Sequence, residues 1–262
     1  MPRFFVQPEF VYEQKISIRG GDSRHITNVL RLGRGDVINV FDGTGKEYVV
    51  LIERASASTV EGRIITEKTI EVESLVEITL FQGLPKAKKM DLIVEKCTEL
   101  GINKIVPIRT ARTIPETDAD YTGTSQMKVR LSRWNKIARE SSKQSGRVKI
   151  PEVCDLIPFS HAINEKTDLS LIPFEGEREQ GIKKTLKRCP VASYPCRVGI
   201  FIGPEGGWTK EEIGQARHNG IIPVSLGLRI LRTETAAMIA CALVLYELEP
   251  IIKSKIPGVS DN

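Results

Sequence analysis

Residues 201–213 read Phe-Ile-Gly-Pro-Glu-Gly-Gly-Trp-Thr-Lys-Glu-Glu-Ile, and they decide the fold of the C-terminal half of the chain. The β-branched run that leads into them, residues 198–202, is typical of a buried strand. This strand must end at Gly203-Pro204, because proline cannot donate to a sheet and glycine permits backbone angles that other residues avoid. Thr209 and Glu212 have the spacing of a capping box, which predicts that a helix begins there. A strand, a glycine-rich turn and a helix together let bare backbone approach a ligand closely.

A second informative stretch, residues 225–237, reads Ser-Leu-Gly-Leu-Arg-Ile-Leu-Arg-Thr-Glu-Thr-Ala-Ala. It places Arg229, Arg232 and Glu234 within six residues, between an expected strand and an apolar helix. Charges beside a core are costly unless they are paired or take part in chemistry. Two interpretations are open: an ion pair that fixes the N-terminus of the helix, where Glu234 is favourable, or a reactive site.

Strand and helix patterns alternate through the rest of this region. β-branched runs predict strands at residues 76–82, 104–108, 169–172, 198–202 and near 223–226. Apolar residues at helical spacing predict helices at about 86–100 and 124–143, through Met90, Ile93, Val94, Cys97 and Leu100 in the first and Met127, Leu131, Trp134 and Ala138 in the second. Gly101 and Gly146 stand where C-terminal caps are expected. The alternation predicts an α/β fold, with a mostly parallel sheet covered by helices on both faces.

The first 72 residues have a different pattern. Short β-branched runs predict strands at residues 37–41, 48–53 and 59–66, with a tight-turn signal at Asp42-Gly43. One helix is expected, with Asp22 as its N-cap and an end near Arg31. Residues 66–74 are polar and predict a linker. We therefore expect a small β domain, residues 1–72, followed by an α/β domain, residues 73–262.

Composition excludes several classes of protein. Of the 262 residues, 40% are hydrophobic and 27% are charged, as in ordinary globular domains. No apolar run approaches the roughly 20 residues that cross a bilayer, and the first residues lack the apolar core of a signal peptide. We therefore expect a cytoplasmic protein with no membrane partner. Five irregularly spaced cysteines favour reduced thiols, and three histidines without CxxC or HxxxH spacing predict no metal site.

Positive charge is concentrated in one part of the chain. The net charge is +5, yet residues 1–72 hold ten basic and ten acidic side chains. Residues 82–149 hold fifteen lysines and arginines against seven acidic residues, a net charge of +8. Such a stretch favours a phosphate-bearing partner such as nucleic acid. A solvated helix face is the alternative interpretation.

Several motifs resemble those of a known family. Gly203-Pro-Glu-Gly-Gly and Leu231-Arg-Thr-Glu-Thr-Ala resemble the two signature loops of the SPOUT class of RNA methyltransferases, and in particular of the RsmE family, which methylates N3 of a uridine in 16S ribosomal RNA. Further stretches resemble other signatures of that family, in the same order: Arg24-His-Ile-Thr-Asn-Val-Leu-Arg, Phe41-Asp-Gly, Lys96-Cys-Thr-Glu-Leu-Gly and Gln144-Ser-Gly-Arg. The resemblance therefore spans nearly the whole chain.

The resemblance implies a fold and partners that periodicity does not show. Residues 1–72 are expected to form a PUA-like β-barrel that holds RNA, and residues 73–262 a SPOUT methyltransferase domain with a C-terminal trefoil knot. S-adenosylmethionine is the implied cofactor. The implied partners are 16S rRNA, as part of the 30S subunit, and a second copy of the chain in a homodimer.

The resemblance also assigns cofactor binding to three loops. The expected cofactor residues are Ile202, Gly203, Pro204, Glu205, Gly206 and Gly207 in the first loop; Ser225, Leu226, Gly227, Leu228, Ile230 and Leu231 in the second; and Pro173, Phe174 and Glu175 in the third. Main-chain recognition of adenine requires close approach without an intervening Cβ. An ordinary strand-to-helix turn and a core connection are the alternative interpretations of the first two loops. Leu228 departs from the family pattern, which often has proline there.

Arg229, Arg232 and Glu234 are the catalytic candidates. Uracil N3 carries a proton that must leave before the nitrogen can attack a methyl group, and the negative charge then spreads to the flanking carbonyl oxygens. The reaction therefore needs a base and a cation near those oxygens. Arginine stays protonated, so we assign charge stabilisation to Arg232 and proton acceptance, or orientation of the base, to Glu234.

Three groups of polar residues are candidates for RNA contact. Lys86, Lys88 and Lys89 stand at the N-terminal end of an expected helix, where cations oppose the helix dipole, and this placement favours phosphate contact over simple solvation. Gln144 and Arg147 lie beyond the basic helix, in a stretch that the family places near the target base and that also fits a helix cap. Arg24, His25 and Arg31 fit either RNA contact or an interface between domains.

Two rival functions remain open at the level of sequence. A related SPOUT enzyme could methylate a ribose 2′-hydroxyl or another base, although the N-terminal motifs favour uridine N3. The second alternative is not an enzyme: a protein that binds structured RNA without catalysing a reaction. Intact Arg232 and Glu234 favour an enzyme.

Overall fold

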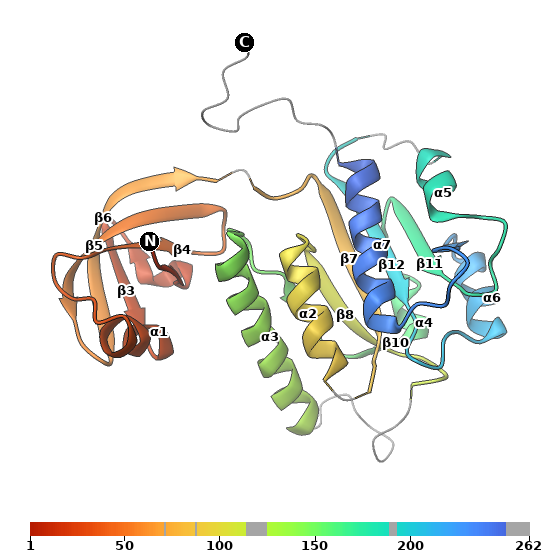
Figure 1. The fold of residues 1–262 in the computed structure, drawn as a ribbon, viewed down its shortest axis with the longest axis horizontal. Helices are drawn as coiled ribbons and strands as arrows, with labels where there is room; N and C mark the ends of the chain where they lie inside the picture. Colours follow the sequence, from red (N-terminus) through yellow and green to blue (C-terminus); the bar gives the residue numbers. More distant parts are fainter. Residues whose placement is uncertain (71, 87, 114–124, 189–192, 250–262) are drawn as a thin grey trace, which may run out of the picture.

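The structure, a computed structural model, describes residues 1–70, 72–86, 88–113, 125–188 and 193–249. It has two sheets at opposite ends of an elongated molecule, with helix α3 between them (Figure 1). Each sheet has its own hydrophobic core. The first sheet ends at Thr69 and the second begins at Val76, so the predicted boundary between residues 72 and 73 lies in the connection between them.

The second sheet is parallel throughout, as the alternating pattern predicts. Its strands are β7 (Val76–Gly83), β8 (Lys104–Arg109), β9 (Glu152–Val153), β10 (Ile157–Pro158), β11 (Leu169–Pro173), β12 (Cys196–Ile202) and β13 (Ile222–Val224). Their order is β10-β8-β7-β12-β11-β13, with β9 paired to β8, and every described pair is parallel. The carboxyl ends of these strands therefore meet at one edge, where open α/β sheets place their ligands.

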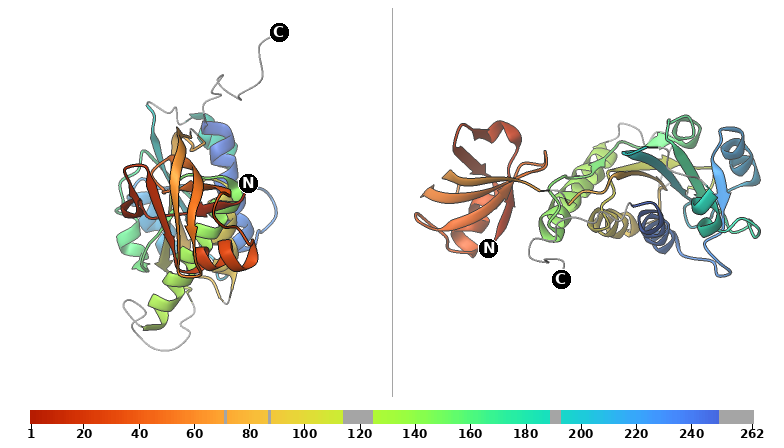
Figure 2. Two further views of the ribbon diagram at one scale, coloured as in Figure 1. Left: turned by 90° about the vertical axis from the view of Figure 1, so that its left-hand side faces the viewer. Right: turned by 90° about the horizontal axis from the view of Figure 1, so that it is seen from above.

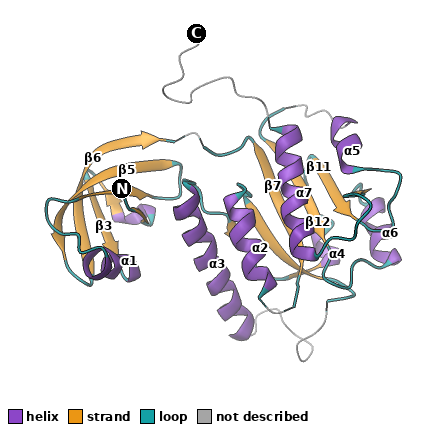
Figure 3. Ribbon diagram, viewed as in Figure 1, coloured by secondary structure: helices purple, strands orange, loops and turns teal. Residues whose placement is uncertain are grey.

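Helices cover both faces of this sheet (Figure 3). They are α2 (Lys89–Glu99), α3 (Ser125–Ser145), α4 (Phe159–Ala162), α5 (Ile182–Arg188), α6 (Lys210–His218) and α7 (Thr233–Leu248). Helices α2, α3, α5 and α7 share one buried cluster with the sheet, and α4 and α6 share the other. Side chains alternate between faces along β12, where Ile200 joins the first cluster and Phe201 the second. No described helix has the length and apolar character needed to cross a membrane.

The first sheet is curled and mainly antiparallel (Figure 2). Its strands are β1 (Arg3–Phe5), β2 (Val11–Tyr12), β3 (Lys15–Arg19), β4 (Val37–Phe41), β5 (Lys46–Ala55) and β6 (Thr59–Thr69), in the order β1-β4-β5-β6-β3-β2. A 3-10 turn (Pro8–Phe10), helix α1 (Gly21–Arg24) and a π-helical turn η2 (His25–Val29) connect them. Alternate residues of β4, β5 and β6 fill a separate core with Ile16, Ile18 and Ile26. This architecture agrees with the predicted small β domain.

Local cap signals are confirmed at three helices. The side chain of Thr209 accepts a hydrogen bond from the amide of Glu212 at 3.1 Å, and the Glu212 carboxylate accepts one from the Thr209 amide at 2.9 Å. Gly101 and Gly146 follow α2 and α3 with φ angles of 99° and 78°, which favour glycine. The deep trefoil knot that the family resemblance implies stays a prediction.

Three local predictions are wrong. Asp22 is not an N-cap: Gly20 holds that position without a side-chain cap bond, and the Asp22 carboxylate binds Lys143 instead. Helix α2 begins at Lys89, so Lys86 and Lys88 precede it. Strand β6 continues to Thr69 because its last residues pair with β5, which shortens the expected 66–74 linker. The errors at Asp22 and β6 arise from contacts with other segments, which a local pattern does not contain.

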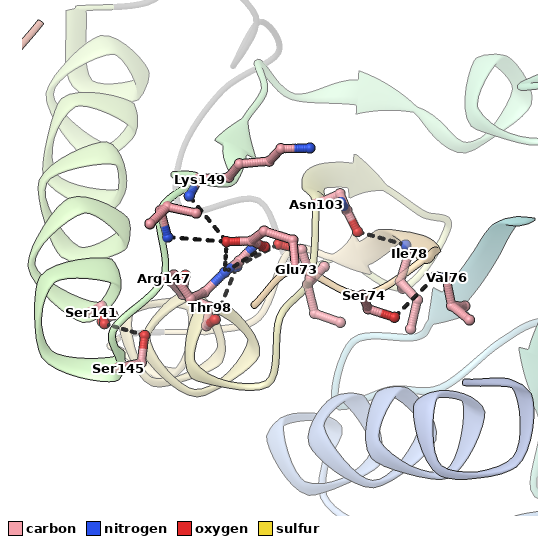
Figure 4. Close-up of polar contacts among 12 residues, drawn as sticks. Glu73, Ser74, Val76, Ile78, Thr98, Asn103, Ser141, Ser145, Arg147 and Lys149 are labelled. Carbon is pink, nitrogen blue, oxygen red and sulfur yellow. Dashed lines mark hydrogen bonds and ion pairs between the residues drawn. The ribbon is translucent and has the colours of Figure 1, made fainter. Parts of the chain in front are cut away.

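A buried ion pair fixes the connection between the two sheets (Figure 4). The guanidinium of Arg147 binds the Glu73 carboxylate, with its shortest contact at 2.7 Å, and their side chains are 6% and 11% exposed. The same guanidinium donates to the carbonyl oxygens of Thr98 and Ile102 at 3.0 and 2.8 Å. Glu73 also accepts from the amides of residues 148 and 149. The connection is therefore attached to the C-terminal ends of both α2 and α3.

Replacing Glu73 by alanine should destabilise the protein strongly, because Arg147 would remain buried without its partner charge. We expect a loss of about 3 to 5 kcal/mol in the free energy of unfolding, measured by urea denaturation. Glu95→Ala is the matched control, since Glu95 pairs with Lys96 in solvent, where both side chains are well exposed. Equal stability of the two variants would contradict the structural role of the pair.

Candidate functional site

A cavity of about 310 Å³ opens at the carboxyl ends of β11, β12 and β13. Its walls are formed by the loops that follow these strands, and each of these loops was predicted to bind the cofactor. Of the predicted cofactor residues, the lining contains Pro173, Phe174, Glu175, Ile202, Gly203, Pro204, Glu205, Gly207, Ser225, Leu226, Gly227, Ile230 and Leu231. Gly206 and Leu228 do not line it: the carbonyl of Gly206 accepts from Arg112 at 2.7 Å, and Leu228 points into solvent.

A chain of hydrogen bonds joins three elements beside the cavity, and two of its members, Gly203 and Thr233, belong to the lining. Thr233, the first residue of α7, donates through Oγ1 to the carbonyl oxygen of Gly203 at 2.6 Å. Gln82, near the end of β7, donates through Nε2 to Thr233 Oγ1 at 2.9 Å. Gln82 and Thr233 were not among the predicted site residues. The available signal for Gln82 was a polar residue directly after the apolar pair Leu80-Phe81 at the end of the strand.

The glycine-rich loop is packed tightly against β7. A Cβ atom added to Gly83 would lie 2.6 Å from both the nitrogen and Cδ of Pro204. Within the loop, the Gly207 amide donates to the Pro204 carbonyl at 2.9 Å, and Gly207 has a φ angle of 67°. The indole of Trp208 donates to the carbonyl oxygen of Pro173 at 3.1 Å, which joins this loop to the one after β11.

Lys89 connects the glycine-rich loop to a catalytic candidate. Its ammonium nitrogen lies 2.8 Å from Glu205 Oε1 and 3.7 Å from Glu234 Oε2. The hydrogen bond with Glu205 raises the pKa of Lys89, although burial and the charge of Arg232 act in the opposite direction. Burial favours a higher pKa for Glu205, but hydrogen bonds from Lys89, its own amide and the Lys86 amide outweigh it, so its pKa is lowered. The site therefore holds Lys89 and Glu205 as a charged pair.

The three catalytic candidates occupy different depths. Arg229 and Arg232 line the cavity and are exposed, and no hydrogen bond or ion pair is found for either guanidinium within the described part of the chain. Glu234 lies outside the lining, with a side chain that is 12% exposed. Its Oε2 atom is buried and has no hydrogen-bond partner among the described residues. Glu234 thus approaches Lys89, and among the described residues no Arg–Glu ion pair is found at this helix start.

The candidate RNA contacts separate into two groups. The side chains of Arg24, His25 and Arg31 are exposed on the first domain, and those of Lys86, Lys88 and Gln144 on the second. Two residues have other roles instead. Lys89 is held by the two carboxylates described above, and the Arg147 guanidinium is buried against Glu73, so a phosphate could not reach it without breaking that ion pair. We therefore remove Arg147 from the candidate RNA contacts.

Comparisons with known proteins identify the family. A family described as an RNA methyltransferase domain matches residues 72–245, and one described as an RNA methyltransferase PUA domain matches residues 18–65. The ribosomal RNA small subunit methyltransferase E of Bacillus subtilis is 30% identical, over 95% of this chain and 98% of its own. The chain belongs to the ribosomal RNA small subunit methyltransferase E family. It is an RNA methyltransferase with an N-terminal PUA-like domain.

Solved structures of similar sequence share the whole fold. The methyltransferase E of Neisseria gonorrhoeae, solved with S-adenosylmethionine bound, is 31% identical with a TM-score of 0.81, and the alignment covers 95% of this chain and 98% of that one. A Legionella pneumophila protein solved in complex with the same cofactor is 29% identical with a TM-score of 0.82, at the same coverage. The similarity to these two solved structures therefore extends over both domains of the chain.

The packing at Gly83 predicts a sensitive position. In Gly83→Ala the added methyl group would overlap the Pro204 ring and backbone, so β7 or the glycine-rich loop must move. We expect roughly 1 to 3 kcal/mol of lost stability in urea unfolding.

Gly214→Ala is the matched control, because it stands in the exposed interior of α6 with open space around its Cβ position. Alanine there should stabilise the helix by roughly 0.5 to 1 kcal/mol. An unchanged stability of Gly83→Ala would show that the loop is not held in the described position.

Proposed function

We propose that this protein transfers a methyl group from S-adenosylmethionine to N3 of a uridine in 16S ribosomal RNA of the small subunit. The observation that carries the proposal is the arrangement of charge at the cavity: two exposed arginines line it without an ion-pair partner among the described residues, and the Glu234 carboxylate lies just outside the lining with its Oε2 atom buried. Removal of an imide proton needs both a base and a cation. Membership of the methyltransferase E family supports the RNA substrate, and we expect the protein to act in the cytoplasm.

The residues of the cavity fit S-adenosylmethionine. Its volume lies within the range of small-molecule sites. The glycines at 203, 207 and 227 leave main-chain atoms accessible, and Ile202, Leu226 and Leu231 supply apolar contacts for an adenine ring. Glu175 and Glu205 add negative charge for a ligand that carries a sulfonium and an ammonium group. When bound, the cofactor would supply an electrophilic methyl group.

In the proposed mechanism, the residues of this chain move the proton and stabilise charge. Glu234 accepts the N3 proton, which requires its carboxylate to turn into the cavity from its buried position, where Oε2 lies 3.7 Å from the Lys89 ammonium nitrogen. Arg232 presents its guanidinium to the carbonyl oxygens that flank N3, where the negative charge develops. Arg229, at the same rim, adds positive charge for the anionic substrate. The Thr233–Gly203 hydrogen bond keeps the helix that carries Glu234 against the cofactor loop.

Substitution of Glu234 and Arg232 tests these roles. Glu234→Gln should lower the rate of methyl transfer to 30S subunits by roughly 10²- to 10⁴-fold, because the amide cannot accept the proton. Arg232→Ala should lower it by roughly 10²- to 10³-fold. The measurement is single-turnover transfer of labelled methyl groups, with the product nucleoside identified by mass spectrometry. Glu165→Gln, remote from the cavity, is the control.

The product distinguishes the competing functions. We expect 3-methyluridine. A 2′-O-methylated nucleoside or another methylated base would indicate a related RNA methyltransferase, and cofactor binding without transfer would indicate a binding protein. If both variants keep the full rate while producing 3-methyluridine, the proposed reaction stands and the assigned residue roles are wrong.

We also propose that the protein is a homodimer that uses α7. Ile239, Leu243 and Tyr246 follow one stripe of this helix and are 41%, 37% and 86% exposed. The loop before the helix exposes Leu228 and Ile230 as well. Apolar side chains at helical spacing on a surface mark an interaction site. Residues of the cofactor loop would then lie near the partner subunit.

Charged substitutions on this stripe should produce a monomer. We expect the double variant Leu243→Glu, Tyr246→Glu to sediment at half the mass of the wild type, because two buried carboxylates per subunit would oppose association. Tyr12→Glu is the control, since Tyr12 is exposed on the first domain. A wild type that sediments as a monomer at assay concentration would contradict the proposal.

A further inference from the structure

The C-terminal end of α3 is capped by an arginine from the other domain. Arg3, the first residue of β1, donates to the carbonyl oxygens of Ser142 and Arg147 at 3.0 and 2.7 Å. Its Nε atom also donates to Glu47 at 2.8 Å, and its guanidinium lies 3.9 Å from the centre of the Phe41 ring. Free carbonyls and the dipole make a helix C-terminus favourable for a cation. The cap therefore holds α3 against the first domain.

A second contact joins the same helix to α1. The ammonium group of Lys143 lies 2.9 Å from each carboxylate oxygen of Asp22, across the domain boundary, and 3.0 Å from Glu140 within α3. The Lys143 side chain is 10% exposed. With the Glu73–Arg147 pair, three separate polar contacts surround the short connection between the domains. All three contacts involve residues 142–147, at the C-terminal end of α3.

These contacts complete a continuous path from the first domain to the cavity. Asp22 lies in α1, two residues before Arg24, a candidate RNA contact. Helix α3 packs along α2 and is also joined to it by the ion pair of Arg133 with Asp91. Asp91 stands in the first turn of α2, two residues after Lys89 at the cavity. The candidate RNA surface is thus connected to the reaction site through packed helices.

We propose that Arg3, Asp22 and Lys143 are positioning residues that set which nucleotide reaches the cavity. They fix the PUA-like domain at one orientation, so RNA held by that domain presents one uridine at a fixed distance. Polar interfaces between domains ordinarily permit relative motion, and a nucleotide misplaced by about 1 Å can lose roughly 10²-fold in rate. This inference rests on the proposed function of the cavity.

Lys143 allows a matched test, because it has one carboxylate partner in each domain. Asp22→Asn removes the contact across the boundary, and Glu140→Gln removes only the contact within α3. For Asp22→Asn we expect about a tenfold higher KM for 30S subunits, equivalent to roughly 1.4 kcal/mol, with added methylation at other uridines. Arg3→Met should act in the same direction. Affinity for S-adenosylmethionine should stay unchanged in all three variants, and Glu140→Gln should match the wild type.

The charge of Asp22 separates positioning from direct RNA contact. Neutralising an acidic residue beside RNA reduces repulsion, so a loss of 30S affinity in Asp22→Asn cannot come from a lost phosphate contact. Loss of such a contact would also reduce the dependence of affinity on salt by about one unit of slope, whereas loss of positioning should leave that slope unchanged. Asp22→Glu, which keeps the charge, should restore most of the wild-type KM.

Small-angle X-ray scattering of the free protein tests the restraint without any activity. Asp22→Asn and Arg3→Met should increase the maximum dimension and broaden the distance distribution, while Glu140→Gln should not. Identical scattering and KM for Asp22→Asn and Glu140→Gln would overturn the inference. If the wild type transfers no methyl group to 30S subunits, the proposed function fails, and the scattering comparison still decides whether these residues restrain the domains.

Discussion

The hydrogen bond from Thr233 to the carbonyl oxygen of Gly203 is the constraint on which the site depends. It joins the start of α7 to the glycine-rich loop, 30 residues earlier in the chain. A hydrogen bond from Gln82 to Thr233 extends the connection to β7. Because the sheet is parallel, these strand ends already lie at one edge. The hydrogen bonds then fix the start of α7 against the glycine-rich loop, so the residues at positions 229–233 line the cavity.

The charges of the site are arranged by their depth. Lys89 lies between two carboxylates, Glu205 and Glu234, whereas Arg229 and Arg232 line the cavity without an ion-pair partner among the described residues. The largely buried Glu234 carboxylate is tolerated because a cation is close. Lys143 in the last turn of α3 serves another purpose at the far end of the helix, where it binds Asp22 of the first domain. The concentration of positive charge in residues 82–149 thus combines structural and substrate-facing roles.

Sequence patterns predicted most elements of the fold and the loops of the site. The prediction for residues 37–41 matches β4, and apolar periodicity placed α2 and α3 to within a few residues. Predictions for single charged residues were less successful. Asp22 resembled a helix cap and Arg147 an RNA contact, yet each binds a partner more than 70 residues away. Such pairings depend on how domains pack, and no local pattern contains that information.

The sequence by itself determined the elements, their alternation, and the family to which the loops belong. Strand and helix periodicity, caps and glycine positions act over a few residues, so they can be read from the chain directly. Tertiary structure alone decided which charges are paired. It placed Lys89 between Glu205 and Glu234, left Arg232 at the cavity with no ion-pair partner among the described residues, buried Arg147, and joined α1 to α3. The physical reason is that burial and the nearest opposite charge determine what an ionisable side chain does, and both arise only when distant segments pack together.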